Sequence, residues 1–210
     1  MKSQKLALAV ALTFAALSAN AQTMVGGAEM FASKDIIDNA VNSKDHTTLV
    51  AAVKAADLVP TLKGAGPFTV FAPTDAAFAQ LPAGTVETLL KPENKPMLTS
   101  ILTYHVVAGR LDAAALRQRI SEGNGKAWLT TVEGEKLTVS AMGATLMLTD
   151  AKGGMSHVTI ADVAQSNGVI HVVDSVVMPA GKSGYGAKQR VSLMDRNDFY
   201  QSQRSMPNGR

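Results

Sequence analysis

Residues 66–78, which read Gly-Pro-Phe-Thr-Val-Phe-Ala-Pro-Thr-Asp-Ala-Ala-Phe, constrain the fold more than any other stretch of the chain. The aromatic and β-branched run Phe68–Phe71 predicts a short strand. This strand should end at Pro73, because proline has no N–H to donate to a sheet. Thr74 is then the expected N-cap of a helix, and Asp75 adds negative charge to its first turn. A strand, a corner and a capped helix so close together indicate either a hub of the fold or only a local corner.

The first residues of the chain are expected to be removed from the mature protein. Lys2 and Lys5 form a basic segment, Leu6–Leu17 an apolar segment and Ala19–Ala21 a small-residue cleavage site, so residues 1–21 resemble a secretory signal peptide. The apolar segment is shorter than the ~20 residues that span a membrane. No later stretch is long and apolar enough to do so. We therefore expect an exported protein, periplasmic or extracellular, without a membrane span.

Composition excludes several classes of site. The chain has no cysteine, which excludes disulfide bonds, thiolate metal sites and a cysteine nucleophile. Its formal net charge of +3 comes from the signal peptide and the C-terminal residues, whereas residues 22–179 contain more acidic than basic side chains. A basic domain that binds nucleic acid is therefore not indicated. The ten methionines are expected to fill gaps in the core.

The order of the expected elements indicates an α+β domain at residues 33–179. Residues 22–32 contain glycine and show no periodicity, which predicts a short exposed lead-in. Four segments have apolar residues at helical spacing, and these are residues 35–41, 49–58, 86–90 and 97–102. Asp45 and Thr47 are the capping candidates for the second of them. After residue 128 the pattern changes to short β-rich runs separated by glycines, which predicts antiparallel strands.

Residues 180–210 lack apolar periodicity and are rich in glycine, polar and basic residues, so we expect a flexible basic tail. The turn signal Asn167-Gly168 predicts a hairpin or tight turn before the last strand. We expect the protein to be a monomer.

Four segments occur in the order found in a known family. They are Thr48–Val53, Gly66–Phe78, Tyr104–Val107 and Asn167–Asp174. Together they resemble the fasciclin domain, and the resemblance covers about residues 33–179. The second and fourth segments look like the two signature segments of that family, and the Tyr-His pair looks like its third motif.

The resemblance implies a fold and a class of function. The fold would be a wedge-shaped β-sandwich of short antiparallel strands with a bundle of helices on one side. The function would be that of a secreted or surface-associated, non-enzymatic module for adhesion and for contacts with proteins or matrix. In animal members of the family, the Tyr-His region and an Asp-Ile segment are linked to integrin binding. Tyr104 and His105 match the first, and Asp162 lies at the place of the second, where Ile160 and Ala161 replace the family's polar pair.

The resemblance also separates binding residues from structural ones. Tyr104, His105 and Asp162 are the expected contact or contact-supporting residues. The residues expected to define the architecture are Phe71, Pro73, Thr74, Asp75, Phe78, Asn167, Gly168, His171 and Asp174. Because His105 follows an apolar helix and precedes two valines, it should be a buried, hydrogen-bonded residue. His171 alternates with Ile170 and Val172, so it should lie on the surface or form a hydrogen bond.

No catalytic motif supports an enzyme. The chain lacks a Gly-x-Ser-x-Gly elbow, a His-Glu-x-x-His pair and a phosphate-binding loop, and its four histidines do not have metal-ligand spacing. We therefore expect no catalysis, metal or cofactor, and a surface protein or matrix polymer as the partner. The alternative hypothesis is a carrier or sensor that holds a small apolar or haem-like ligand in a groove near Tyr104 and His105.

Overall fold

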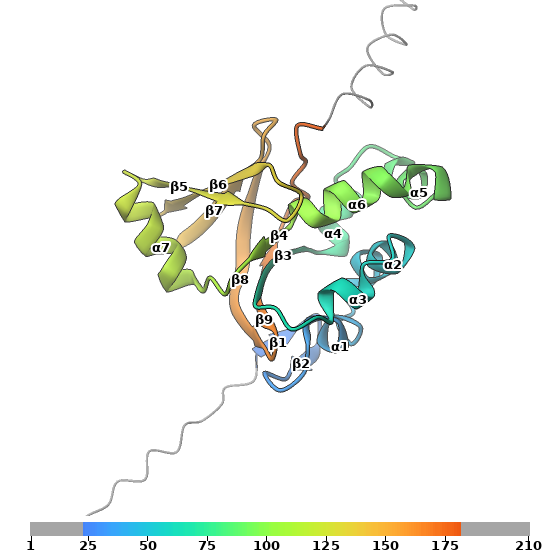
Figure 1. The fold of residues 1–210 in the computed structure, drawn as a ribbon, viewed down its shortest axis with the longest axis horizontal. Coiled ribbons are helices and arrows are strands. Elements are labelled where there is room, and N and C mark those ends of the chain that lie inside the picture. The colour runs from blue at the N-terminus through green and yellow to red at the C-terminus, as the bar shows by residue number, and fades with distance from the viewer. Residues whose placement is uncertain (1–22, 182–210) are drawn as a thin grey trace, which may run out of the picture.

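A seven-stranded sheet organises residues 23–181, the part of the chain that the computed structural model describes. Its strand order is β4-β3-β9-β8-β7-β6-β5. A bridge between Val107 and Thr131 brings the first and last strands together, so the sheet nearly closes on itself (Figure 1). The predicted signal peptide and the predicted tail beyond Gly181 lie outside the described residues. The seven strands are β3 (Phe68–Pro73), β4 (Val106–Ala108), β5 (Lys126–Thr130), β6 (Lys136–Met142), β7 (Thr145–Thr149), β8 (Met155–Gln165) and β9 (Gly168–Val173).

The long strand β8 joins the two layers of a sandwich. Its beginning, Met155–His157, pairs with β7, and its remainder pairs with β9. The register shifts between Val158 and Val163, and such bulges bend a strand. One layer therefore contains β5, β6 and β7, and the other contains β3, β4 and β9.

Strands β3 and β9 form the centre of the fold, as expected for a hub rather than a local corner. They run parallel in register from Phe68 opposite Gly168 to Pro73 opposite Val173, so the sheet is mixed and not wholly antiparallel. All residues of β9, and all of β3 after Phe68, are buried. A Cβ on Gly168 would lie 2.1 Å from the carbonyl oxygen of Phe68, so only glycine permits this close approach.

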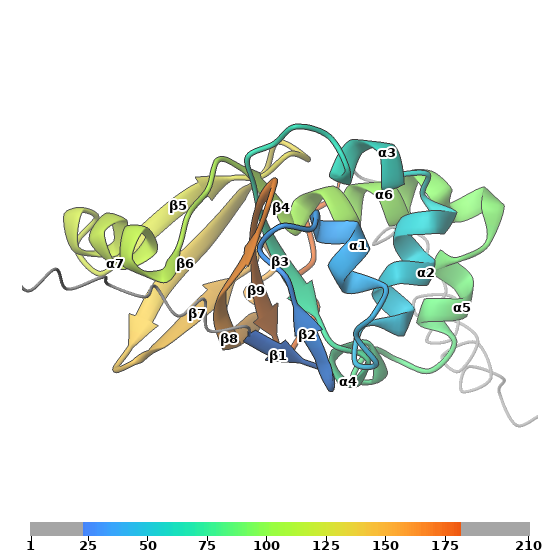
Figure 2. The ribbon, with the colours of Figure 1, turned by 90° about the horizontal axis from the view of Figure 1, so that it is seen from below.

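Helices α1 to α6 cover one face of the central strands, and Figure 2 shows them on one side of the molecule, whereas α7 lies at the opposite end beside β5 and β6. Val70 and Ile170 point toward them and share a core with apolar residues of α1, α2 and α6. A second core lies inside the sandwich, where Leu116 of α7 packs against β5, β6 and β7. The helices are α1 (Ile36–Ala40), α2 (Thr47–Ala55), α3 (Val59–Leu62), α4 (Asp75–Ala79), α5 (Thr85–Leu89), the short 3₁₀ helix η1 (Pro92–Asn94), α6 (Lys95–Tyr104) and α7 (Ala113–Glu122).

The predicted exposed lead-in is instead part of the fold. Strands β1 (Thr23–Val25) and β2 (Ala28–Met30) form an antiparallel hairpin. Val25 and Met30 are both 5% exposed and belong to the helix-side core. Strands of three residues are too short to show a period-2 pattern, which explains why the segment reads as aperiodic.

The predicted N-cap is confirmed for α4 and is wrong for α2. Thr74 caps α4 as predicted, since its hydroxyl accepts a hydrogen bond from the backbone N–H of Ala77. Helix α2 has His46 at its N-cap, and that side chain forms no capping bond, so the prediction of Asp45 as its cap is wrong. Thr47 is already the first residue of the helix.

Candidate functional site

Tyr104 and His105 lie where α6 ends and β4 begins, inside the molecule. Tyr104 is 0% exposed, and its hydroxyl donates to the carbonyl of Lys136 at 3.0 Å and accepts from the N–H of Ala151 at 3.2 Å. Burial raises the pKa of Tyr104 to about 12, so the phenol stays neutral. A buried phenol whose hydroxyl both donates and accepts a hydrogen bond within the protein stabilises the fold and is not itself a contact surface.

His105 is a buried structural histidine, as predicted, and is 3% exposed. The N–H of Val177 donates to Nε2 at 3.2 Å, so Nδ1 carries the proton and donates to the carbonyl of Ile101 at 2.8 Å. Burial lowers the pKa of His105 to about 4, so the ring is neutral at pH 7. Both nitrogens are occupied, which leaves neither free to bind a haem iron.

Two small cavities on the helix side of the sheet do not support the carrier hypothesis either. A cavity of about 40 Å³ lies between α1, α2, α3 and the sheet, with His105 in its lining. A second cavity of about 30 Å³ borders His46 and Met30. An apolar cavity that binds benzene measures roughly 150 Å³. In this arrangement neither space accommodates a haem-like molecule.

Asp162 is the one predicted binding residue that is exposed. It lies in the bulge of β8 with φ of 62°, a conformation that aspartate adopts more readily than most residues. Its Oδ1 accepts from the N–H of Ala113 at 2.7 Å, at the first turn of α7. The N-cap of that helix is Asp112, which accepts from the N–H of Ala115. Two carboxylates therefore meet at the start of α7.

His171 connects Asp162 to the centre of the sheet. The backbone N–H of Asp162 donates to its Nδ1 at 3.3 Å, and its Nε2–H donates to the carbonyl of Leu111 at 2.8 Å. The imidazole stacks on Phe71, with 5.6 Å between ring centroids. His171 is 0% exposed, so of its two predicted placements the hydrogen-bonded one is observed. The backbone N–H of Phe71 donates in turn to the carbonyl of His105, so a series of buried contacts links Asp162 to His105.

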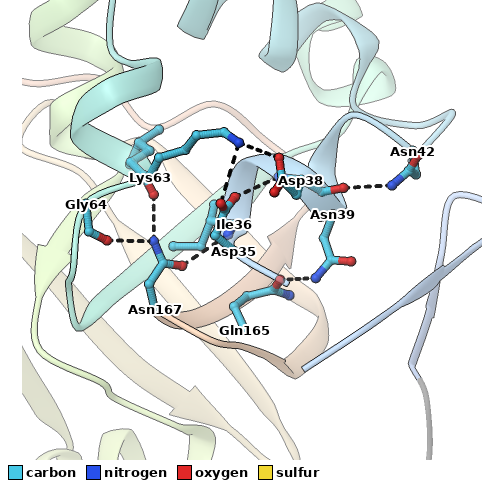
Figure 3. Close-up of polar contacts among 10 residues, drawn as sticks. Asp35, Ile36, Asp38, Asn39, Asn42, Lys63, Gly64, Gln165 and Asn167 are labelled. Carbon is cyan, nitrogen blue, oxygen red and sulfur yellow. Dashed lines mark hydrogen bonds and ion pairs between the residues drawn. The ribbon is translucent and has the colours of Figure 1, made fainter. Parts of the chain in front are cut away.

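Asn167 joins three segments that are far apart in the sequence (Figure 3). It lies in the two-residue turn between β8 and β9, which confirms the predicted hairpin. Its Nδ2 donates to the carbonyls of Leu62 and Gly64 at 2.7 and 3.0 Å, and its Oδ1 accepts from the N–H of Ile36 at 3.1 Å. The side chain thus holds the end of α3 and the start of α1 against the sheet.

Next to this junction lies a buried amide pair that sequence reasoning missed. Asn39 is 0% exposed, its Nδ2 donates to the carbonyl of Phe31 at 2.8 Å, and it also donates to Oε1 of Gln165. Gln165 is 1% exposed. Figure 3 shows the two amides facing each other between α1 and the end of β8. The only signal in the sequence was a polar residue within the apolar face of the first helix.

Asp75 has a second role that local sequence does not reveal. Its carboxylate accepts from the backbone N–H groups of Thr47 and Thr48 at 3.2 and 2.8 Å, and from the Thr47 hydroxyl at 2.6 Å. It therefore caps α2, although it belongs to the first turn of α4. Burial opposes ionisation, but these hydrogen bonds lower the pKa of Asp75 below its usual value.

We expect Asp75→Ala to lower the free energy of unfolding by about 1–2 kcal/mol, because it removes the cap of α2 and an acidic group from α4. Urea unfolding at pH 7 measures this difference. Asp45→Ala is the matched control, since Asp45 is exposed and its side chain does not cap α2. Equal losses in the two variants would contradict the capping role.

The sequence matches the model of the Fasciclin domain over residues 44–179. The chain belongs to the fasciclin family. Protein sll1483 of Synechocystis is 48% identical over 146 residues, which cover 69% of this chain and 73% of that protein. Immunogenic protein MPT70 of Mycobacterium tuberculosis is 39% identical over 67% of this chain and 66% of its own. Cell surface glycolipoprotein MPB83 of Mycobacterium bovis is 34% identical over 73% of this chain and 64% of its own.

The fold agrees with a solved member of the same family. The FAS1 domain pair of the insect cell adhesion molecule Fasciclin I superposes with a TM-score of 0.61 at 18% identity, covering 69% of this chain and 51% of that one. This likeness shows a shared fold. It confirms the α+β fasciclin fold, with its strands in a sandwich and helices α1 to α6 on one side, while α7 packs against the other layer.

No helix in residues 23–181 is long and apolar enough to cross a membrane. Within the same residues, no three histidine, aspartate or glutamate side chains gather where they could hold a metal ion.

Proposed function

We propose that this fasciclin protein is an exported, non-enzymatic module that binds a protein or a matrix polymer of the cell envelope through its surface. Family membership supports the proposal, as do the names of relatives, which include a cell surface glycolipoprotein. The solved structure with this fold comes from a cell adhesion molecule. A signal peptide at residues 1–21 is consistent with a periplasmic or extracellular location.

One observation carries the proposal: the polar side chains of the family segments are used to build the domain. Tyr104, His105, His171 and Asn167 all form hydrogen bonds with backbone groups and are buried. A nucleophile or general base needs access to a substrate, and these groups have none. These buried side chains therefore hold the domain together, and the exposed surface of the domain is left as the part that can bind a partner.

Asp162 is the contact residue that we propose on this surface, and Tyr104 and His105 support it from within. Asp162 is exposed at the start of α7, and its backbone is tied to His171 beneath it. The stack of His171 on Phe71 then reaches the backbone of His105. A buried network of this kind holds an exposed carboxylate in one position, which lowers the entropic cost of binding.

Capture from the native envelope tests this proposal. Immobilised mature protein should retain an envelope component that is lost with Asp162→Ala. Asp112→Ala is the control for the acceptor that each substitution removes from the first turn of α7, a loss of ~1 kcal/mol of stability. Asp162→Ala also places alanine at a φ of 62° and should cost more, so thermal melting must show that this variant is folded. If both variants retain the component equally, or if wild type retains nothing above a blank support, the proposed contact is wrong.

A further inference from the structure

Three methionines lie outside the core, on the outer face of the layer formed by β6, β7 and the beginning of β8. Met142 on β6 is 61% exposed and Met155 on β8 is 60% exposed, and Met147 on β7 is half-buried. The expectation that methionines fill gaps in the core is therefore wrong for these residues. They point outward because they alternate with buried residues such as Leu146 and Leu148.

Two of these methionines lie beside a histidine. In the pairing of β7 with β8, Met147 is opposite His157 and Thr149 is opposite Met155. Met155 and His157 are two residues apart on one strand, so they share its outer face. Opposite residues have Cβ atoms about 5 Å apart and diagonal ones about 7–8 Å apart, within reach of long side chains. Two flexible thioethers and one imidazole can therefore converge on a single point above the sheet.

Asp174 holds the imidazole of His157 in one orientation. Its Nδ1 lies 3.0 Å from Oδ2 of Asp174, and the backbone N–H of His157 donates to Oδ1 of Asp174 at 2.7 Å. The Ser156 hydroxyl also lies within 3.3 Å of Oδ1 of Asp174, so the carboxylate is held in place from two sides. A carboxylate on Nδ1 holds the proton there and leaves the lone pair on Nε2. Within residues 23–181, Nε2 forms no hydrogen bond, and the His157 side chain is 40% exposed.

We propose that Met147, Met155 and His157 form a surface binding site for copper(I), with Asp174 as the residue that positions the histidine. Thioether sulfur and imidazole nitrogen are soft ligands, and this combination selects copper(I) over magnesium or calcium, which prefer oxygen. Zinc sites use cysteine, histidine and carboxylate ligands, and thioethers are not among them. This function is separate from the binding of an envelope partner through Asp162.

The test measures copper(I) binding to the full mature chain without oxygen, in competition with a chromophoric copper(I) chelator. Met147→Leu, Met155→Leu and His157→Gln should each abolish binding of one equivalent. Met142→Leu is the matched control, because Met142 is equally exposed on the same face but lies outside the cluster. Asp174→Asn should weaken binding about tenfold, as removal of a carboxylate partner of a metal-binding histidine commonly does.

Silver(I) provides a second readout, since it has the same ligand preference and does not change oxidation state under these conditions. The methyl resonances of Met147 and Met155 and the ring resonances of His157 should shift together at one equivalent of silver(I), and those of Met142 should not. Thermal melting shows whether each variant is folded. No competition with the chelator by wild type, or full affinity in folded His157→Gln, would overturn the proposal.

Discussion

Replacing Asn167 with alanine should lower the free energy of unfolding by about 3 kcal/mol. The side chain satisfies the N–H of Ile36 and the carbonyls of Leu62 and Gly64, and the residue is only 8% exposed. Each buried backbone group that loses its partner costs roughly 1–3 kcal/mol. Urea unfolding measures the change, and the midpoint should fall without a change in slope, because the unfolded state is the same.

Asn42→Ala is the control for this prediction (Figure 3). Asn42 also donates through its side chain to a backbone carbonyl of α1, that of Asp38 at 2.7 Å, but this bond is exposed to water. Substitutions of exposed residues usually change stability by less than about 0.5 kcal/mol. A loss in Asn167→Ala no larger than in Asn42→Ala would show that water replaces the three contacts, and the junction would then not hold α1 and α3 in place.

Residues 73–75 show which features of the fold a local sequence pattern can predict and which it cannot. The strand that ends at Pro73 and the cap at Thr74 follow from residues within a few positions, and the structure confirms both. That Asp75 caps α2 depends on a helix 27 residues earlier in the chain. No local pattern contains this contact, because it exists only after α2 and α4 pack together.

The same limit applies to the secondary structure. The strands β6 to β9 were predictable because each alternates or is flanked by glycine turns. The hairpin of β1 and β2 was not, because its burial is decided by Val25 and Met30 reaching a core formed by distant helices. Helix α7 was not among the predicted helices, because the residues that it buries are only Leu116 and Ile120, and two apolar residues make a weak helical pattern.

For the candidate site, the family resemblance named three residues, and the sequence predicted burial for only one of them. Tyr104 and His105 were named by the family resemblance, and His105 was correctly expected to be buried. That Tyr104 is also enclosed, while Asp162 is exposed at a positive φ, follows from the bulge in β8 and the closure of the sheet. Both are consequences of strand pairing between segments far apart in sequence.

Acid should destabilise this protein well above the pH at which carboxylates titrate. Three histidines are buried and neutral: His46, His105 and His171. Burial lowers the pKa of each below its value of ~6.5 in an unfolded chain, and the pKa of His105 falls to about 4. Nearby carboxylates oppose the shift only in part, namely Asp45 and Asp75 at His46, Asp150 at His105, and Asp162 and Asp112 at His171.

The sign of the effect follows from proton counts. At pH 7 the three rings are neutral in both states, so their stabilisation is complete. As the pH falls below ~6.5 the unfolded chain takes up protons that the folded protein cannot, so the free energy of unfolding falls with pH. For His105 this continues down to about pH 4, where the folded protein also binds the proton. That single shift amounts to about 3 kcal/mol between neutral pH and pH 4.

His105→Gln isolates this contribution. Urea midpoints measured between about pH 4.5 and 6.5 should give a stability curve that is flatter than wild type by about one proton per molecule, because the group that the unfolded chain protonates is gone. Tyr104→Phe is the matched control, since it removes a buried hydroxyl next to His105 and lowers stability, but the pKa of Tyr104 is about 12 and it does not titrate in this range. Its curve should therefore lie below that of wild type and run parallel to it. If His105→Gln also runs parallel to wild type, the ring of His105 is not kept neutral by burial, and the acid sensitivity must come from His46 and His171 instead.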